Sequence, residues 1–228
     1  MLKNLKDLYG ARLGAADGDI GYVKDFYFDD HAWALRYLLA DAPKWLPARQ
    51  LLFSPLMFGS RPFGFSEADP KILRVSLNRT KIEESPVIAS GRAVSRADEE
   101  AYYAYHGLKG HWHAAPVAGE PRWPTPGPWP VDHLPSLRST KALDGYVVNS
   151  TDGPVGHVRG LRADDQTWQI REIAIDTGPW YARRSLYLSP ANVIAIDHDK
   201  RSLFVNLPTR DFRGSMRDDV VQPDAGFH

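Results

Sequence analysis

The chain has 228 residues, with 28 basic and 28 acidic side chains, so its formal net charge is zero. Non-specific nucleic-acid binding needs clustered positive charge, which makes nucleic acid an unexpected partner. The chain contains no cysteine, which excludes disulfides, thiolate catalysis and cysteine-based zinc sites. No apolar run approaches the roughly 20 residues of a membrane span, so we expect a cytoplasmic protein that has no membrane span.

The first predicted elements belong to an internal repeat. Residues 8–55 align without a gap with residues 143–190, so that each residue of copy one corresponds to the residue 135 positions later in copy two. The identical pairs are Leu8/Leu143, Gly10/Gly145, Asp17/Asp152, Gly18/Gly153, Gly21/Gly156, Val23/Val158, Asp29/Asp164, Asp30/Asp165, Trp33/Trp168, Arg36/Arg171, Asp41/Asp176, Trp45/Trp180, Arg49/Arg184, Leu51/Leu186, Ser54/Ser189 and Pro55/Pro190. A repeat of this length predicts two similar small units.

Copy one predicts a series of short strands with no helix between them. They cover residues 11–15, 20–28, 33–39, 51–53 and 72–77. We expect Asp17 and Gly18 to supply the positive φ angles of a tight hairpin, and Trp33 to begin the third strand. This pattern favours a small antiparallel barrel over an α/β sheet.

Copy two repeats this plan, with strands over residues 146–150, 155–161, 168–175, 185–188 and 203–207. After Pro55 the offset falls from 135 to 130, so that Val75 matches Val205. The extra residues of copy one lie within residues 58–69, a Gly-rich insertion and a candidate for what distinguishes the copies.

A helix and a proline-rich linker are predicted between the copies. Ser95 is a suitable N-cap, acidic residues follow it, and Tyr102 and Tyr105 recur at helical spacing. Residues 115–135 contain seven prolines and predict an extended connector, with a proline-rich ligand for a partner domain as the alternative. The expected domains are residues 1–86, a helix plus linker at 87–135, residues 136–213 and a flexible tail at 214–228.

Two groups of side chains could carry chemistry. His106, His111 and His113 could bind a metal, but histidines on the surface at a helix end are the favoured interpretation. The aspartate pairs 29–30 and 164–165 are interpreted as turn residues that point into solvent. No nucleotide-binding or hydrolase motif occurs. We therefore expect no catalytic residue, no cofactor and no metal.

The repeated tryptophans and arginines are the candidate interface residues. Trp33, Trp168, Trp45 and Trp180 are expected to anchor loops or the core, with an exposed interface anchor as the alternative. Arg36 and Arg171 are expected to form ion pairs that fix loops, with a ligand-binding salt bridge in each copy as the alternative.

The repeated pattern resembles the PRC-barrel family. It reads Asp-Gly-x-x-Gly-x-Val at residues 17–23 and 152–158, followed by Trp-x-x-Arg at residues 33–36 and 168–171. That family includes the cytoplasmic domain of the photosynthetic reaction-centre H subunit and the C-terminal domain of the ribosome-maturation factor RimM. The resemblance implies two small antiparallel β-barrels in tandem. It also implies a binding or scaffolding module, because the family has no common catalytic residues.

Three functional hypotheses follow. The first is a non-enzymatic protein-interaction, scaffolding or regulatory module with an unidentified protein partner. A homo-oligomer is compatible with this hypothesis. The second is an RNA- or ribosome-associated factor, suggested by RimM and by the basic residues at 159–162 and 183–184. The third is a histidine-based metal-binding protein.

Overall fold

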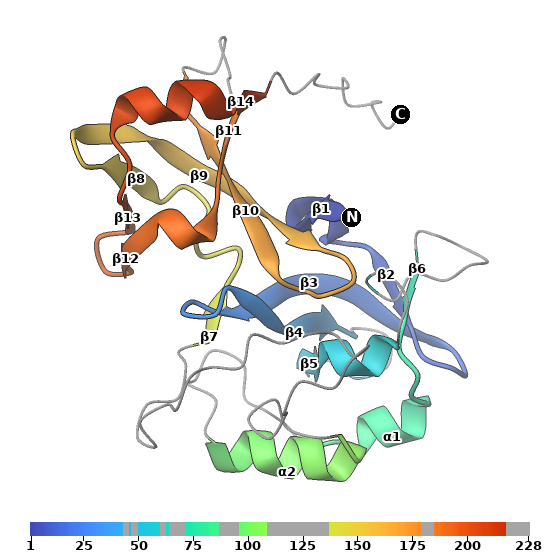
Figure 1. Ribbon diagram of the computed structural model, residues 1–228. Helices are drawn as coiled ribbons and strands as arrows, with labels where there is room; N and C mark the ends of the chain where they lie inside the picture. Colours follow the sequence, from blue (N-terminus) through green and yellow to red (C-terminus); the bar gives the residue numbers. More distant parts are fainter. Residues whose placement is uncertain are drawn as a thin grey trace, which may run out of the picture. The chain divides into compact units, whose positions relative to one another are not determined.

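The computed structural model describes residues 1–42, 46, 50–59, 63, 72–86, 96–108, 137–178 and 185–217. These residues form a mainly β protein with two sheets and few helices (Figure 1). The proline-rich linker at 115–135 lies outside the described residues, as do residues 218–228 of the expected tail. Of the helices that are described, none is long and apolar enough to cross a membrane.

The first sheet contains the strands of copy one. Its order is β5 (Gln50–Phe53), β4 (Ala34–Asp41), β3 (Asp19–Asp29), β2 (Arg12–Gly14) and β6 (Ile72–Arg74), and β7 (Leu137–Ser139) also pairs with β3. The pairing of β2 with β6 is parallel. All other pairings in this sheet of the described residues are antiparallel.

The second sheet contains the strands of copy two. Its order is β12 (Val193–Asp197), β13 (Ser202–Val205), β8 (Val147–Ser150), β9 (Gly153–Asp164), β10 (Ile170–Asp176), β11 (Ser185–Leu188) and β14 (Met216–Arg217). The short strand β1 (Leu2–Asn4) also pairs with β9, and β13 pairs with β8 in parallel.

Both sheets are therefore mixed, which corrects the prediction of purely antiparallel sheets. A parallel pair needs a long crossover connection, and in each copy the late strand returns to the first one after such a connection. Within the part of the chain that the structure describes, neither strand order closes into a barrel.

Short helices connect the strands. They are the 3-10 helices η1 (Leu5–Leu8), η2 (Pro55–Phe58), η5 (Pro190–Asn192) and η6 (Thr209–Ser215), and the α-helices α1 (Arg79–Glu83) and α2 (Arg96–His106). Ser54 and Ser189 cap η2 and η5, and a proline follows each cap at the first helical position, where its missing N–H is tolerated. The predicted helix between the copies is confirmed as α2, whereas its expected N-cap Ser95 lies outside the described residues.

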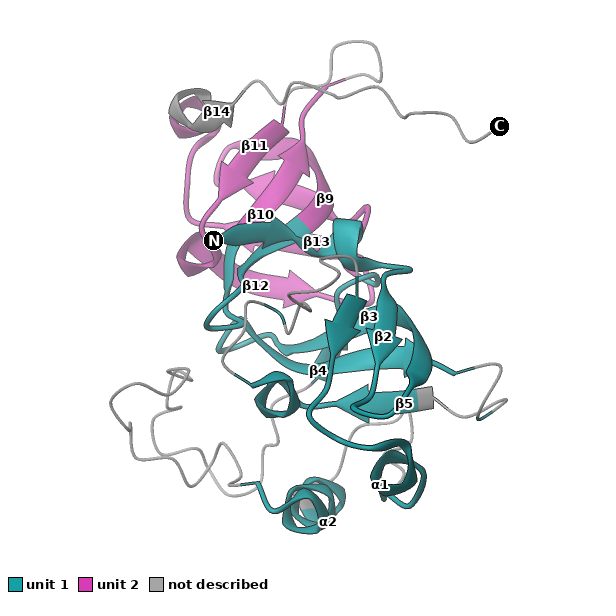
Figure 2. Ribbon diagram, turned by 90° about the vertical axis from the view of Figure 1, so that its right-hand side faces the viewer, with its two compact units in different colours: residues 1–142, 161–171 teal, residues 143–160, 172–228 magenta. Residues whose placement is uncertain are grey.

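The chain divides into two compact units (Figure 2). Unit 1 contains Met1–Ala142 and Leu161–Arg171, and unit 2 contains Leu143–Gly160 and Glu172–His228. Unit 1 thus includes a segment of copy two, from the end of β9 through the turn to the start of β10. This segment is central to the candidate site.

Equivalent strands in the two sheets pair in the same register. Leu38 faces Phe53 in copy one, and Ile173 faces Leu188 in copy two, 135 residues later. In the parallel pairs, Leu13 faces Leu73 and Val148 faces Leu203. The partners Leu73 and Leu203 are 130 residues apart, which is the reduced offset that the sequence predicts after Pro55.

The turns before and after β3 differ from the prediction. Gly18 has no positive φ, whereas Trp33 has a φ of 51° and its equivalent Trp168 has a φ of 57°. The Trp33 N–H donates to the Asp29 carbonyl at 2.7 Å, and the Trp168 N–H donates to the Asp164 carbonyl at 2.8 Å. Each tryptophan therefore closes a turn, and β4 begins one residue later than expected, at Ala34.

Two equivalent glycines are required where strands pack closely. A Cβ atom on Gly21 would lie 1.9 Å from the Asp41 carbonyl oxygen, and one on Gly156 would lie 2.1 Å from the Asp176 carbonyl oxygen. Both obstructing atoms belong to the backbone, so neither clash can be relieved by a side-chain rotation.

We predict that Gly21→Ala lowers the free energy of unfolding by about 3 kcal/mol, because the backbone of β4 must move to admit the methyl group. Gly14→Ala is the matched control, since its Cβ would meet neighbours at ordinary distances of 3.5 Å or more. We expect the control to stay within about 1 kcal/mol of the wild type in urea denaturation. Equal effects of the two substitutions would contradict the prediction.

Candidate functional site

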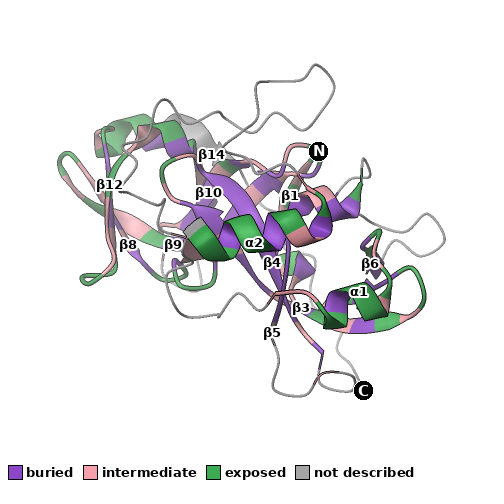
Figure 3. Ribbon diagram, turned by 90° about the horizontal axis from the view of Figure 1, so that it is seen from below, coloured by how far each residue is buried: buried purple, intermediate pink, exposed green. Residues whose placement is uncertain are grey.

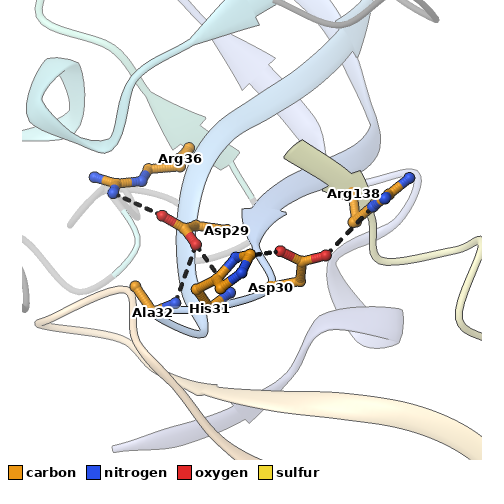
Figure 4. Close-up of polar contacts among 6 residues, drawn as sticks. All are labelled: Asp29, Asp30, His31, Ala32, Arg36 and Arg138. Atoms are coloured by element: carbon orange, nitrogen blue, oxygen red, sulfur yellow. Dashed lines mark hydrogen bonds and ion pairs between the residues drawn. The ribbon is translucent and has the colours of Figure 1, made fainter. Parts of the chain in front are cut away.

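The Asp29 carboxylate organises the turn between β3 and β4 (Figure 4). Its Oδ1 atom accepts hydrogen bonds from the backbone N–H groups of His31 and Ala32, both at 3.0 Å. Its Oδ2 atom accepts a hydrogen bond from Arg36 Nη2, also at 3.0 Å. The side chains of Asp29 and Arg36 are 0% and 2% exposed. Asp29 therefore does not point into solvent as predicted, because it neutralises a buried guanidinium.

The equivalent Asp164 forms the same turn in a different environment. Its Oδ1 atom accepts hydrogen bonds from the N–H groups of Gln166 at 3.1 Å and Thr167 at 2.9 Å. Burial opposes ionisation of Asp164, but these hydrogen bonds outweigh it and lower its pKa. Arg171, the equivalent of Arg36, is exposed. The neighbouring Asp165 is buried and accepts a hydrogen bond from the Met1 ammonium group. One aspartate of each repeated pair is thus buried.

The two turns meet within unit 1. Ala34 and Gln169, which are equivalent residues, form an antiparallel bridge. The Leu35 N–H donates to the Trp168 carbonyl at 2.9 Å, and the Ile170 N–H donates to the Trp33 carbonyl at 2.8 Å. Exchanging the two copies converts each of these hydrogen bonds into the other. The contact is therefore isologous, as in a two-fold symmetric dimer.

Aromatic packing holds both tryptophans in unit 1. Trp168 packs edge-on against Phe63 at 4.7 Å between ring centroids, and against Phe58 at 5.2 Å. Trp33 packs against Phe28 at 5.4 Å. Trp33 and Trp168 are both buried, as expected for loop or core anchors. Trp45 and Trp180 lie outside the described residues.

Phe63 is a site residue that the sequence did not single out. It belongs to the predicted insertion at 58–69, most of which lies outside the described residues. The Phe63 side chain is fully buried, and its N–H donates to the Asp165 carbonyl at 2.9 Å. The only sequence signal was the length difference between the copies.

Asp25 anchors the strand β7, and sequence reasoning missed it too. Its carboxylate is buried and accepts hydrogen bonds from the hydroxyls of Ser139 and Thr140, and from the N–H of Lys141. The equivalent position in copy two is Gly160, so this anchor belongs to copy one alone. Ser139, Thr140 and Lys141 all lie at the start of copy two, whereas the Phe26 N–H, a further donor to Asp25, belongs to copy one.

Asp29, Asp30 and His31 form the candidate metal cluster of the described residues, with ligand atoms within 4.8 Å of one another. The Asp29 carboxylate is already bound to Arg36 and to two backbone N–H groups. Asp30 contacts His31 Nδ1 at 2.9 Å and Arg138 Nε at 3.4 Å. The carboxylates of this cluster are therefore already in contact with Arg36, His31 and Arg138 of the protein itself. His111 and His113 lie outside the described residues.

Helix α2 lies over the sheet of unit 1 (Figure 3), and a buried polar network joins the helix to the sheet. Tyr37 Oη donates to Glu99 Oε1 at 2.7 Å, and Tyr102 Oη donates to the Leu52 carbonyl at 2.6 Å. The Tyr103 and Ser54 hydroxyls lie 3.3 Å apart. Burial raises the pKa of Tyr37 and of Tyr102, so both stay neutral as hydrogen-bond donors.

His106 completes the buried face of α2. Its Nε2 atom lies 2.8 Å from the Ser85 hydroxyl, and its ring packs edge-on against Tyr102 at 4.7 Å. Burial, with a smaller contribution from Lys81, lowers the pKa of His106 from 6.5 to about 4. The prediction of a surface histidine was wrong here, because α2 packs its last turn against the segment that follows α1.

The face beneath α2 has a more exposed equivalent in copy two. In unit 1 it is formed by Tyr37, Leu52, Ser54 and Met57, all of which are buried. The equivalent residues of unit 2 are Glu172, Tyr187, Ser189 and Asn192, all of which are half-buried or exposed. We call these four residues of unit 2 the open face. Among the described residues, this face is therefore buried beneath α2 in copy one and half-buried or exposed in copy two.

No protein-family model matches the chain, and no curated protein matches it.

We predict that Asp29→Asn lowers the free energy of unfolding by about 3–5 kcal/mol, because it leaves the buried Arg36 guanidinium without its counter-charge. Asp164→Asn is the matched control, because the equivalent Arg171 is exposed and an asparagine oxygen can still cap the turn. We expect a loss of about 1 kcal/mol or less for the control. Equal losses in urea denaturation would show that the buried pair has no special role.

We predict that His106 makes the protein less stable in mild acid. The unfolded histidine titrates near 6.5 and the folded one at about 4, so the unfolded state binds the extra proton between these pH values. The free energy of unfolding should therefore fall by about 1–2 kcal/mol as the pH falls through this window, after allowing for partial solvent screening.

Urea denaturation of His106→Gln between pH 7 and pH 4 checks this prediction. The variant should lose this component of the pH dependence, whereas His157→Gln, which changes an exposed histidine, should retain it. An unchanged pH dependence in His106→Gln would contradict the assignment.

Proposed function

We propose that this protein is a non-enzymatic interaction and scaffolding module, built from two PRC-type units, that binds a helical segment of a protein partner on the open face of unit 2. The observation that carries the proposal is the difference in cover between equivalent surfaces. Tyr37, Leu52, Ser54 and Met57 are buried, whereas their equivalents in unit 2 are half-buried or exposed.

The polar side chains of the described residues support a structural role rather than catalysis. The repeated aspartates form turns, Arg36 neutralises Asp29, and Asp25 fastens β7. The buried tyrosines hold α2 in place. These groups are engaged within the fold, so they contribute to stability and to the positioning of strands.

The repeated strand registers support the assignment to tandem PRC-type units. The pairings of β4 with β5 and of β10 with β11 are equivalent, as are those of β2 with β6 and of β8 with β13. In addition, the clashes at Gly21 and Gly156 give a physical reason for the repeated Asp-Gly-x-x-Gly pattern.

The expected partner follows from the way α2 binds. Tyr102 donates to the carbonyl of Leu52, and Tyr103 contacts the hydroxyl of Ser54. Copy two has the same two groups in the carbonyl of Tyr187 and the hydroxyl of Ser189, the latter also serving as the cap of η5. A partner helix that presents neighbouring tyrosines on one face fits these groups, which is the helix-in-groove mode of recognition.

Site-specific photo-crosslinking tests this proposal. A photoreactive phenylalanine analogue replaces Tyr187 in the full chain, and the same analogue at the exposed Arg210 is the matched control. We expect the Tyr187 position to capture a defined protein that the Arg210 position does not capture. Adding Ser189→Arg to the Tyr187 variant should abolish the capture, because the larger side chain blocks the face.

Three results would overturn the proposal. They are capture of the same proteins from both positions, capture of RNA instead of protein, and capture that Ser189→Arg leaves unchanged. A turnover activity of the pure protein that is lost on changing one polar side chain would contradict the non-enzymatic assignment. Circular dichroism of each variant confirms that a loss of capture does not reflect unfolding.

A further inference from the structure

The first strand of each copy pairs with the long strand of the other copy. β1, at the start of copy one, pairs with β9, so that Leu2, Lys3 and Asn4 face Asp164, Ala163 and Arg162. β7, at the start of copy two, pairs with β3, so that Leu137, Arg138 and Ser139 face Asp29, Phe28 and Tyr27. Every residue in the second set is the equivalent, 135 positions away, of a residue in the first. The copies thus exchange their leading strands reciprocally.

The paired turns lie beside these exchanged strands in sequence and in unit 1. Asp29 and Asp164 each end an exchanged pairing and begin the turn that leads to Ala34 or Gln169. The strand exchange and the Ala34–Gln169 bridge therefore form one continuous isologous interface. Reciprocal exchange of identical elements about such a contact is the arrangement of a strand-swapped homodimer.

We propose that this interface also forms between chains, so that a second copy of this protein is a binding partner through exchange of whole copies. Copy one of one chain then pairs with copy two of another, and β7 and the turn at 165–169 come from the second chain. Both assemblies contain the same hydrogen bonds and the same buried aromatic contacts. This inference goes beyond the proposed function and uses neither the open face nor a helical partner.

The linker and the protein concentration decide which of two assemblies forms. In the closed monomer the paired copies belong to one chain, and in the exchanged dimer they belong to two chains. Residues 107–136 connect α2 to β7. Covalent connection of two binding modules makes their association intramolecular, with an effective concentration of about millimolar. The closed monomer should therefore dominate in dilute solution. Refolding at high protein concentration should populate the exchanged dimer, because the two assemblies differ in connectivity rather than in contacts.

The chain has no cysteine, which allows a direct test at the bridge. Ala34 and Gln169 are the non-hydrogen-bonded pair between two flanking hydrogen bonds. Their Cα atoms are expected about 4.5 Å apart, within the range of a disulfide. The double variant Ala34→Cys/Gln169→Cys should therefore close an internal disulfide when it is refolded and oxidised at about 1 μM, below the effective concentration of the tether.

The decisive experiment mixes the two single variants. Chains with Ala34→Cys and chains with Gln169→Cys are unfolded, mixed, refolded at several concentrations and oxidised. In the closed monomer each cysteine faces a residue that is not cysteine, whereas in the exchanged dimer the two cysteines face each other. We expect a covalent heterodimer on non-reducing gels, with a yield that rises several-fold between low and high refolding concentration.

The controls make each outcome decisive. Either single variant refolded alone should give no covalent dimer, and circular dichroism shows that each is folded. Failure of the double variant to form its internal disulfide would show that the bridge is wrong. Formation of that disulfide without any heterodimer from the mixed chains, at any refolding concentration, would overturn exchange between chains. Neither result depends on the crosslinking partner at Tyr187, so failure here leaves the proposed function standing.

Discussion

The antiparallel bridge between Ala34 and Gln169 is the contact on which the organisation of unit 1 depends. Its two hydrogen bonds, from Leu35 to Trp168 and from Ile170 to Trp33, fix the two turns against each other. Both tryptophans have positive φ, a conformation that costs a bulky residue about 1–2 kcal/mol. The strain is retained in both copies because it directs each tryptophan carbonyl toward the other turn while the ring remains in the core.

Unequal burial of identical residues follows from elements outside the repeat. Arg36 and Arg171 occupy equivalent positions, yet Arg36 is buried and Arg171 is exposed. The asymmetry coincides with α2, which covers the face of unit 1 with Glu99, Tyr102, Tyr103 and His106. A buried guanidinium requires a counter-charge, which Asp29 supplies. The repeated Asp and Arg therefore form a buried ion pair in copy one, whereas no such pair is seen between Asp164 and the exposed Arg171 in the described part of copy two.

The sequence predicted those parts of the structure that local pattern determines. Strand alternation located β3, β4, β8 and β11 to within a few residues, and the offset change after Pro55 predicted which residues of β6 and β13 are equivalent. It could not predict β1 and β7, because strands of three residues carry no periodic pattern and their partners lie in the other copy. Asp25 was missed for the same reason, since the two hydroxyls that donate to it are more than 100 residues away.

The candidate site was less predictable because its properties arise from non-local contacts. An aspartate pair in a turn normally faces water, and only the burial of Arg36 draws Asp29 inward. His106 lies at the end of a helix, where histidines are commonly solvated, yet it packs against Ser85 and Tyr102. In both cases the side chain obeys the usual rule that a buried polar group needs a partner. What the sequence lacks is the identity of that partner, which depends on how distant segments meet.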